Sequence, residues 1–254
     1  MKKNSYFSTT FIILLALSLS AQPVRQAETV KPTVLRTIPH DPEAFTQGLV
    51  CIDSTLYEST GIVGQSSLRK IDAESGKVLT IIPVPDLFGE GLAFKNGELV
   101  QLTWKAGLAI RYQFPSLKPG GVYKYSGQGW GLTSNDSHFI MSNGSDTLYY
   151  RNDQFSIEKT VAVTLNGKPL KNLNELEFVD NRIYANIWFR NFIAEISTEG
   201  KVTRIIDCSE LVNRENPPDP NHVLNGVAYC ENRDVWYLTG KNWKSIYVVK
   251  IPKP

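Results

Sequence analysis

Short apolar runs alternate with small and polar residues along most of this 254-residue chain, and most runs are too brief for helices. They are rich in β-branched and aromatic residues and are bounded by Asp, Asn and Gly, which is typical of short β-strands joined by tight turns. The best helix signal is the short segment SELVNRE at residues 209–215. The pattern predicts an all-β protein.

One strand-turn-strand unit recurs five times. Each copy opens with a small or polar pair, enters an apolar strand, turns through Asp, Asn or Gly, and enters a second strand. The copies are FTQGLVCIDSTLYESTG from Phe45, FGEGLAFKNGELVQLTWK from Phe88, GWGLTSNDSHFIMSNG from Gly129, LNELEFVDNRIYANIWF from Leu173 and LNGVAYCENRDVWYLTGK from Leu224. The matching positions Gly48, Gly91, Gly131, Glu175 and Gly226 are 40 to 51 residues apart, which fits four-stranded propeller blades.

Each repeat continues into a third strand, and the first four continue into a fourth. The fifth repeat stops after its third strand, SIYVVKI, whereas TVLRTIPHD, from Thr33, precedes the first repeat and reads like the other fourth strands. We therefore predict a five-bladed β-propeller of four-stranded blades, closed by the N-terminal strand pairing into the last blade. Closure also protects the sheet edges. An open β-sandwich or a different barrel is the alternative fold.

The first 21 residues have the pattern of a secretory signal peptide. Lys2 and Lys3 precede an apolar run from Phe11 to Leu19, and small residues follow up to Ala21. The run is shorter than the roughly 20 apolar residues of a membrane helix. The predicted organisation is a signal peptide at 1–21, a lead segment at 22–32 and one propeller domain at 33–254. We expect an exported monomer, periplasmic or extracellular.

The charge balance argues against two classes of partner. The chain has 27 Lys and Arg against 25 Asp and Glu, and two of these lysines lie in the predicted signal peptide. The mature protein is therefore close to neutral. No nucleic-acid partner and no anionic membrane surface is expected.

The cysteines do not form a recognisable metal or disulfide pattern. Cys51, Cys208 and Cys230 are too few and too scattered for a disulfide scaffold or a zinc site. We interpret them mainly as small buried apolar residues. A bridge between Cys208 and Cys230 stays open in an oxidising compartment.

The histidines give no metal signal either. His40, His138 and His222 lie far apart in unlike contexts, and we expect each on the surface or in a loop. We predict no metal site and no cofactor, although a structural cation in the central channel remains an alternative.

The first strand of each propeller blade lines the central channel, so equivalent repeat positions converge there. The residues just before the aligned positions are Gln47, Glu90, Trp130, Asn174 and Asn225. Such a ring predicts a polar site with an aromatic wall. The competing interpretation is that polar residues simply fill a wet channel.

A second set of positions falls at the ends of the second strands. Its members are Gly61, Trp104, Gly144, Trp188 and Lys241. Aromatic walls with a few fixed polar groups are the usual composition of a small-molecule site. Among all ten positions, Glu90 is the one acid, and burial beside indoles would raise the pKa of its carboxyl group toward neutral pH. This suits Glu90 to general acid/base chemistry.

Several strings of this sequence resemble the plant and bacterial glutaminyl cyclases, which fold as five-bladed propellers. The resemblance runs in order from about Val34 to Ile251 and rests on AFTQGL, YESTG, GQSSLR, FGEGL, LTWK, GWGL, LNELE, ANIW, LNGVA and TGKNW. One departure is Val63 in GIVGQSS, where an aromatic residue is common in the family. The animal glutaminyl cyclases are zinc enzymes of another fold.

The resemblance implies conversion of N-terminal glutamine of peptides and proteins to pyroglutamate, with release of ammonia. It implies that Glu90 is the proton shuttle. It also places Phe45, Gln47, Trp104, Trp130, Asn174, Trp188 and Lys241 in the substrate site. The alternative is a non-catalytic propeller that binds a peptide or sugar in its channel. A metal-dependent propeller hydrolase or lactonase would need several acidic or histidine ligands at the axis.

Overall fold

The computed structural model describes residues 1–2 and 26–253. The predicted signal peptide and its cleavage site therefore lie almost entirely outside the described residues. No helix in the described part of the chain is long and apolar enough to cross a membrane.

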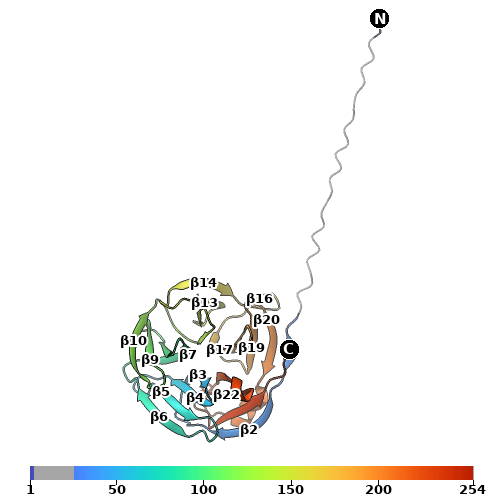
Figure 1. Ribbon diagram of the computed structural model, residues 1–254. Helices are drawn as coiled ribbons and strands as arrows, with labels where there is room; N and C mark the ends of the chain where they lie inside the picture. The colour runs from blue at the N-terminus through green and yellow to red at the C-terminus, as the bar shows by residue number, and fades with distance from the viewer. Residues whose placement is uncertain (3–25, 254) are drawn as a thin grey trace.

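Five separate sheets surround a central axis (Figure 1). This arrangement confirms the predicted propeller and excludes the sandwich. Blade I comprises β3 (Thr46–Ile52), β4 (Thr55–Thr60), β5 (Ser67–Asp72) and β6 (Val78–Pro83); blade II, β7 (Gly89–Lys95), β8 (Glu98–Thr103), β9 (Leu108–Gln113) and β10 (Lys118–Lys124); blade III, β11 (Leu132–Ser134), β12 (Phe139–Met141), β13 (Thr147–Arg151) and β14 (Ile157–Ala162); blade IV, β17 (Leu173–Val179), β18 (Arg182–Ile187), β19 (Phe192–Ser197) and β20 (Val202–Asp207); blade V, β21 (Leu224–Cys230), β22 (Val235–Gly240), β23 (Ser245–Lys250) and β2 (Thr33–Pro39).

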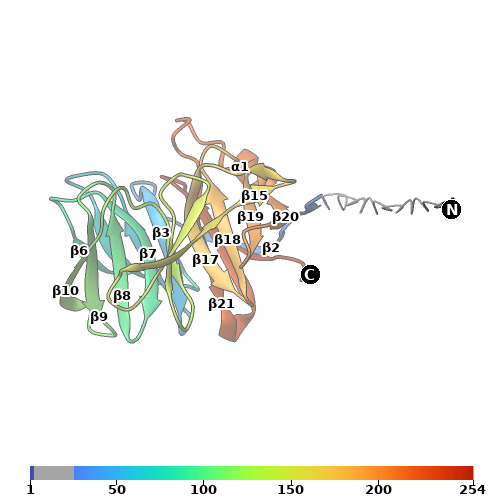
Figure 2. The same cartoon turned by 90° about the horizontal axis from the view of Figure 1, so that it is seen from above.

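The remaining elements lie outside the blades. They are β1 (Glu28–Val30), the hairpin of β15 (Thr164–Leu165) and β16 (Lys168–Pro169), the helix α1 (Ser209–Glu215) and the 3₁₀ turn Glu231–Arg233. The bounds of α1 match the helix predicted from the sequence. Viewed from the side of the ring, α1 and its neighbouring loop lie toward one end of the molecule (Figure 2).

The ring closes through the N-terminal strand, as predicted. β2 pairs antiparallel with β23, and Thr33 lies opposite Lys250. β1 makes a second N-terminal contact that the sequence did not predict, since it adds to blade IV in parallel with β20. The outer edges of β23 and β20 are thus each paired with an N-terminal strand.

The inner strands β3, β7, β11, β17 and β21 contact one another in a closed circle. Their backbones come so close that side chains do not fit at some positions: a methyl group on Gly91 would overlap the backbone of Leu132, and one on Gly131 would overlap the carbonyl of Asn174. At the matching position of blade IV stands Glu175 instead. Its carboxylate is fully buried and accepts hydrogen bonds from the backbone N–H groups of Leu49 and Val227, 3.2 and 2.9 Å away.

The cysteine interpretation was wrong in one respect. Cys51 and Cys230 form a disulfide with a Cα–Cα distance of 5.3 Å, whereas Cys208 is free and buried. The reason is ring closure, because β3 and β21 are neighbours at the junction of blades I and V. Two cysteines near the ends of these strands therefore meet, although 179 residues separate them in sequence.

Candidate active site

One end of the channel opens into a pocket of about 230 Å³, where the two sets of repeat positions meet. All eight residues predicted for the substrate site line it: Phe45, Gln47, Glu90, Trp104, Trp130, Asn174, Trp188 and Lys241. Phe88 and Asn221 complete the lining and were not predicted. The structure thus brings together side chains that come from all five repeats.

Local irregularities aim the first set of side chains at the pocket. Four inner strands shift register against their partners at the repeat position itself: Gln47 in β3, Glu90 in β7, Asn174 in β17 and Asn225 in β21. A bulge of this kind redirects a side chain that would otherwise follow the regular alternation of the strand. The repeated bulge explains why equivalent positions converge.

The second set follows from the antiparallel pairing of the first two strands in each blade. The end of the second strand returns to the start of the first, so Trp104 after β8, Trp188 after β18 and Lys241 after β22 reach the same end of the channel. The two glycines of this set, Gly61 and Gly144, instead leave space for aromatic rings. A side chain at Gly61 would overlap the ring of Phe88, and one at Gly144 would overlap the indole of Trp130.

Glu90 and Lys241 are the two ionisable groups of the pocket, and each is about 5% exposed or less. Burial raises the pKa of the Glu90 carboxyl well above its usual range, and the positive charge of Lys241 offsets only part of this rise. Burial also lowers the pKa of Lys241 to about 8, against the opposing influence of Glu90. The Lys241 ammonium lies 4.8 Å from the ring centroid of Phe45. The pKa of each group is thus shifted toward neutral pH, as is common for groups in active sites.

Aromatic rings form two walls of the pocket. Phe88 contacts Phe45 and Trp104 at ring-centroid distances of 6.2 and 5.5 Å. On the other side, Trp130 meets Trp188 edge to face at 5.3 Å. The indole N–H groups of Trp104 and Trp130 both donate to the Oε1 atom of Gln128, at 2.9 and 3.1 Å. Gln128 thus holds the two walls at a fixed separation.

Three carboxamides line the pocket, and two of them, Asn174 and Gln47, belong to the predicted set. Asn174 is 2% exposed, and its side-chain amide has no hydrogen-bond partner among the described residues. Gln47 accepts a hydrogen bond from Nδ2 of Asn225, 3.2 Å away, and the same Nδ2 donates to the backbone carbonyl of Thr46 at 2.9 Å. Asn225 therefore lies behind Gln47 and does not line the pocket.

Comparison with known proteins matches this arrangement to one family. The glutamine cyclotransferase family matches residues 8–251. The chain belongs to this family. It is 35% identical over 225 residues to the glutaminyl-peptide cyclotransferase of Arabidopsis thaliana, which covers 86% of this chain and 70% of the relative. The crystal structure of Myxococcus xanthus glutaminyl cyclase is 34% identical, superposes with a TM-score of 0.85, and is matched over 89% of this chain and 98% of its own.

A buried ion pair supports the pocket from behind. The Nε2 atom of His40 lies 2.8 Å from Oε1 of Glu58, and its Nδ1 atom lies 2.8 Å from the carbonyl oxygen of Trp243. Both partners are acceptors, so both ring nitrogens carry protons. Thr46, next to Gln47, donates to the same carboxylate oxygen at 2.7 Å. His40 was expected on the surface or in a loop. It lies in the loop directly after β2 but is buried, because ring closure places it between β4 and the loop after β22.

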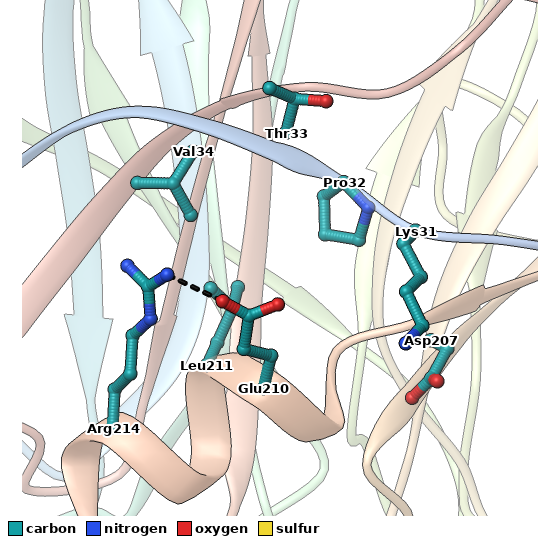
Figure 3. Close-up of a pocket in the computed structure, with 8 residues that line it drawn as sticks. All are labelled: Lys31, Pro32, Thr33, Val34, Asp207, Glu210, Leu211 and Arg214. Carbon is teal, nitrogen blue, oxygen red and sulfur yellow. Dashed lines mark hydrogen bonds and ion pairs between the residues drawn. The ribbon is translucent and has the colours of Figure 1, made fainter.

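Other hollows lie away from these residues. Figure 3 shows one of about 350 Å³ between α1 and the linker from β1 to β2, where Glu210 and Arg214 form an ion pair. The opposite mouth of the channel, about 630 Å³, has acidic side chains such as Asp53 and Glu177. Among the residues that the structure describes, no three His, Cys, Asp or Glu side chains are arranged to hold a metal ion.

Three residues of the pocket region were missed by sequence reasoning. Phe88 had a signal, since it precedes Glu90 by two residues, as Phe45 precedes Gln47. Asn221 lies in the excursion between α1 and β21 and has no equivalent in the other repeats. Gln128 precedes the third repeat and was not covered by the alignment.

Proposed function

We propose that this pocket binds the N-terminal glutamine of a peptide or protein and converts it to pyroglutamate with release of ammonia. The observation that supports this most directly is Glu90, a buried carboxyl group with a raised pKa in an aromatic pocket that also holds the uncommitted carboxamide of Asn174. Membership of the glutamine cyclotransferase family supports the same reaction.

The reaction is intramolecular, which determines what the pocket must do. The α-amine of glutamine attacks its own γ-carbonyl carbon, so a C–N bond to the α-nitrogen forms and the C–N bond to the leaving nitrogen breaks. Folding the side chain into this geometry removes much of the entropic barrier. The indoles of Trp130 and Trp188 can pack on the glutamine methylenes and exclude water.

Glu90 carries out both proton transfers of this reaction. It takes a proton from the attacking α-amine and delivers one to the leaving nitrogen, so that ammonia departs and the carboxyl group ends in its starting state. A shuttle works best when its pKa lies near the working pH, and the desolvation of Glu90 shifts it in that direction. Positioned acid/base catalysis of this type contributes roughly 10²–10⁴-fold to the rate.

Lys241 and Asn174 can stabilise the negative charge that develops on the γ-carbonyl oxygen. The Lys241 ammonium is buried, so water screens its charge only weakly. The side-chain amide of Asn174 has no hydrogen-bond partner among the described residues and can donate to the substrate. Removing one such donor typically costs about 10²–10³-fold in kcat. Gln47, fixed by Asn225, can hold the substrate amide.

No metal ion or cofactor is required by this mechanism, because each proton transfer and charge is assigned to a side chain. We further infer that the protein acts after export, since residues 1–21 have a signal-peptide pattern. We also propose that it acts as a monomer and that its substrates are peptides and proteins. A structural cation in the channel is compatible with the same chemistry.

The direct test is incubation of the purified protein with Gln-Gly and measurement of released ammonia. We expect ammonia and pyroglutamyl-glycine in equal amounts. Glu-Gly serves as the control substrate, since it has the same shape but no γ-amide nitrogen to release as ammonia. Binding of Gln-Gly without ammonia release would instead indicate a binding module.

A further inference from the structure

The pocket leaves most of a peptide substrate outside. Its volume of about 230 Å³ is smaller than the roughly 300–1,000 Å³ of pockets that enclose drug-sized ligands. It therefore accommodates one amino-acid residue, and the second residue of the substrate must lie at the rim. This argument rests on the proposed function, because it takes an N-terminal glutamine as the occupant of the pocket.

The rim presents one large exposed aromatic side chain. Phe189 is 51% exposed and directly follows Trp188, which lines the pocket. Their ring centroids are 4.4 Å apart with an interplanar angle of 32°. Together with the contact between Trp188 and Trp130, this makes a continuous aromatic surface from the inside of the pocket to solvent.

The backbone holds Phe189 in an unusual conformation. Its φ is 61°, in the left-handed region that bulky residues rarely adopt. The turn is fixed on both sides of it: the Trp188 N–H donates to the Asn172 carbonyl at 2.9 Å, and the Arg190 N–H donates to the Ile187 carbonyl at 2.8 Å. A strained residue persists when the surroundings enforce it, and such residues concentrate at ligand sites.

Most other exposed apolar side chains are explained by their position. Between residues 26 and 253, seven large apolar side chains are highly exposed. Five of them lie in the outermost strands of the blades: Leu35 in β2, Leu79 and Ile81 in β6, Val122 in β10 and Ile157 in β14. The other two are Phe189 and Val63. Val63 lies two residues after Gly61, in the loop between β4 and β5 of blade I, and a side chain at Gly61 would overlap the ring of Phe88. Val63 and Phe189 thus lie close in sequence to positions near different pocket residues, Phe88 and Trp188.

We propose that Phe189 forms a subsite for the side chain of the second substrate residue and makes the enzyme favour peptides with an apolar or aromatic residue after the N-terminal glutamine. Phe189 is the better platform than Val63, because its ring extends the Trp188 surface and aromatic faces bury a large apolar area. A contact outside the reacting centre contributes equally to ground state and transition state. Its effect therefore falls mainly on KM.

The test compares ammonia release from Gln-Phe amide and Gln-Gly amide. We expect kcat/KM of the parent to favour Gln-Phe amide by about tenfold, as burial of part of an aromatic side chain provides. In Phe189→Ala this preference should fall to about twofold or less, while kcat/KM for Gln-Gly amide stays within about twofold of the parent. Phe189→Leu should restore part of the preference.

Val63→Ala is the matched control and should keep the parental preference. A preference that is absent in the parent, survives in Phe189→Ala, or disappears in Val63→Ala would overturn the subsite. Turnover of Gln-Gly amide reports on the proposed function separately. If neither peptide releases ammonia, the proposed reaction fails; if both react equally well, the reaction stands and only the subsite fails.

Discussion

The Nε2 atom of His40 lies 2.8 Å from Oε1 of Glu58, and each side chain is about 1% exposed. This pair joins the end of the closing strand β2 to blade I, directly behind Thr46. Burial lowers the pKa of His40, but Glu58 and the Trp243 carbonyl together outweigh burial, so the pKa is raised. Burial raises the pKa of Glu58, but His40, Thr46 and Arg69 together outweigh burial, so the pKa is lowered. Arg69, which itself pairs with Asp41, opposes the rise at His40.

The pair should therefore stabilise the fold within a defined pH window. The contribution of His40 is complete below its unfolded pKa of 6.5 and is lost as pH rises through its raised folded pKa. The contribution of Glu58 is complete above 4.5 and is lost as pH falls through its lowered folded pKa. We expect the contribution of the pair to be largest between about pH 4.5 and 6.5, measured as the difference in unfolding free energy between the parent and the double variant His40→Leu/Glu58→Leu across pH.

Breaking only one partner should be more damaging. His40→Leu leaves a buried carboxylate and should lose about 3–5 kcal/mol at pH 6. The exposed pair His138 and Glu158, 3.0 Å apart, is the control, and His138→Ala should cost about 1 kcal/mol or less. Equal losses at the two sites would contradict this interpretation of the buried pair.

Glu90→Gln should separate catalysis from binding. The variant keeps the shape of the side chain but cannot shuttle a proton, so kcat should fall by at least about 10²-fold while KM changes little. Glu43→Gln, at an exposed residue two positions before Phe45, should keep parental kcat. Parental turnover by Glu90→Gln would show that the carboxyl group only fills the channel.

Loss of the Lys241 charge should make the rate decline at alkaline pH. The substrate must attack as a free amine, and model α-amines titrate near 7.7, so the rate rises from acid pH. Lys241 loses its charge above a pKa of about 8, so the stabilisation of the oxyanion declines there. In Lys241→Arg the charge persists and this decline should disappear from the profile of kcat, whereas the exposed Lys105→Arg should leave the profile unchanged.

Catalysis should not depend on a metal ion. We expect activity to survive prolonged treatment with EDTA or phenanthroline, because the proposed roles belong to side chains. A loss of turnover that added zinc restores would require a different mechanism.

The closing strand should matter more than the strand before it. Removal of residues 1–32 takes away β1 alone and should leave the ring closed, whereas removal of residues 1–39 also opens the edge of β23. We expect the longer truncation to lose at least about 3 kcal/mol, or roughly 6–12 °C in Tm, and to aggregate. Two truncations with equal Tm and solubility would contradict closure through β2.

The repeat explains how much could be predicted from the sequence. Positions that recur in every blade were found because the propeller converts sequence period into spatial convergence, and so Gln47 and Glu90 could be placed together without any contact information. Features that depend on one junction were missed. The disulfide of Cys51 and Cys230 and the burial of His40 both arise where blades I and V meet. Because these contacts occur at one junction only, a repeating sequence pattern does not predict them.

Asn221 is a second kind of feature that could not be predicted from the sequence. Excursions between repeats are not constrained by the period, so neither their path nor their side-chain directions follow from it. The excursion after α1 returns to the pocket mouth, and only the structure reveals this.

The pairing of β2 with β23 also links completion of the fold to the order of protein synthesis. Among the described blade strands, the closing strand β2 is synthesised first and its partner β23 last. A chain that stops early therefore displays unpaired edges at both ends, however well its finished blades have formed. Such edges promote aggregation of incomplete chains and expose them to chaperones and proteases, because only a chain that has been synthesised through β23 can close the ring.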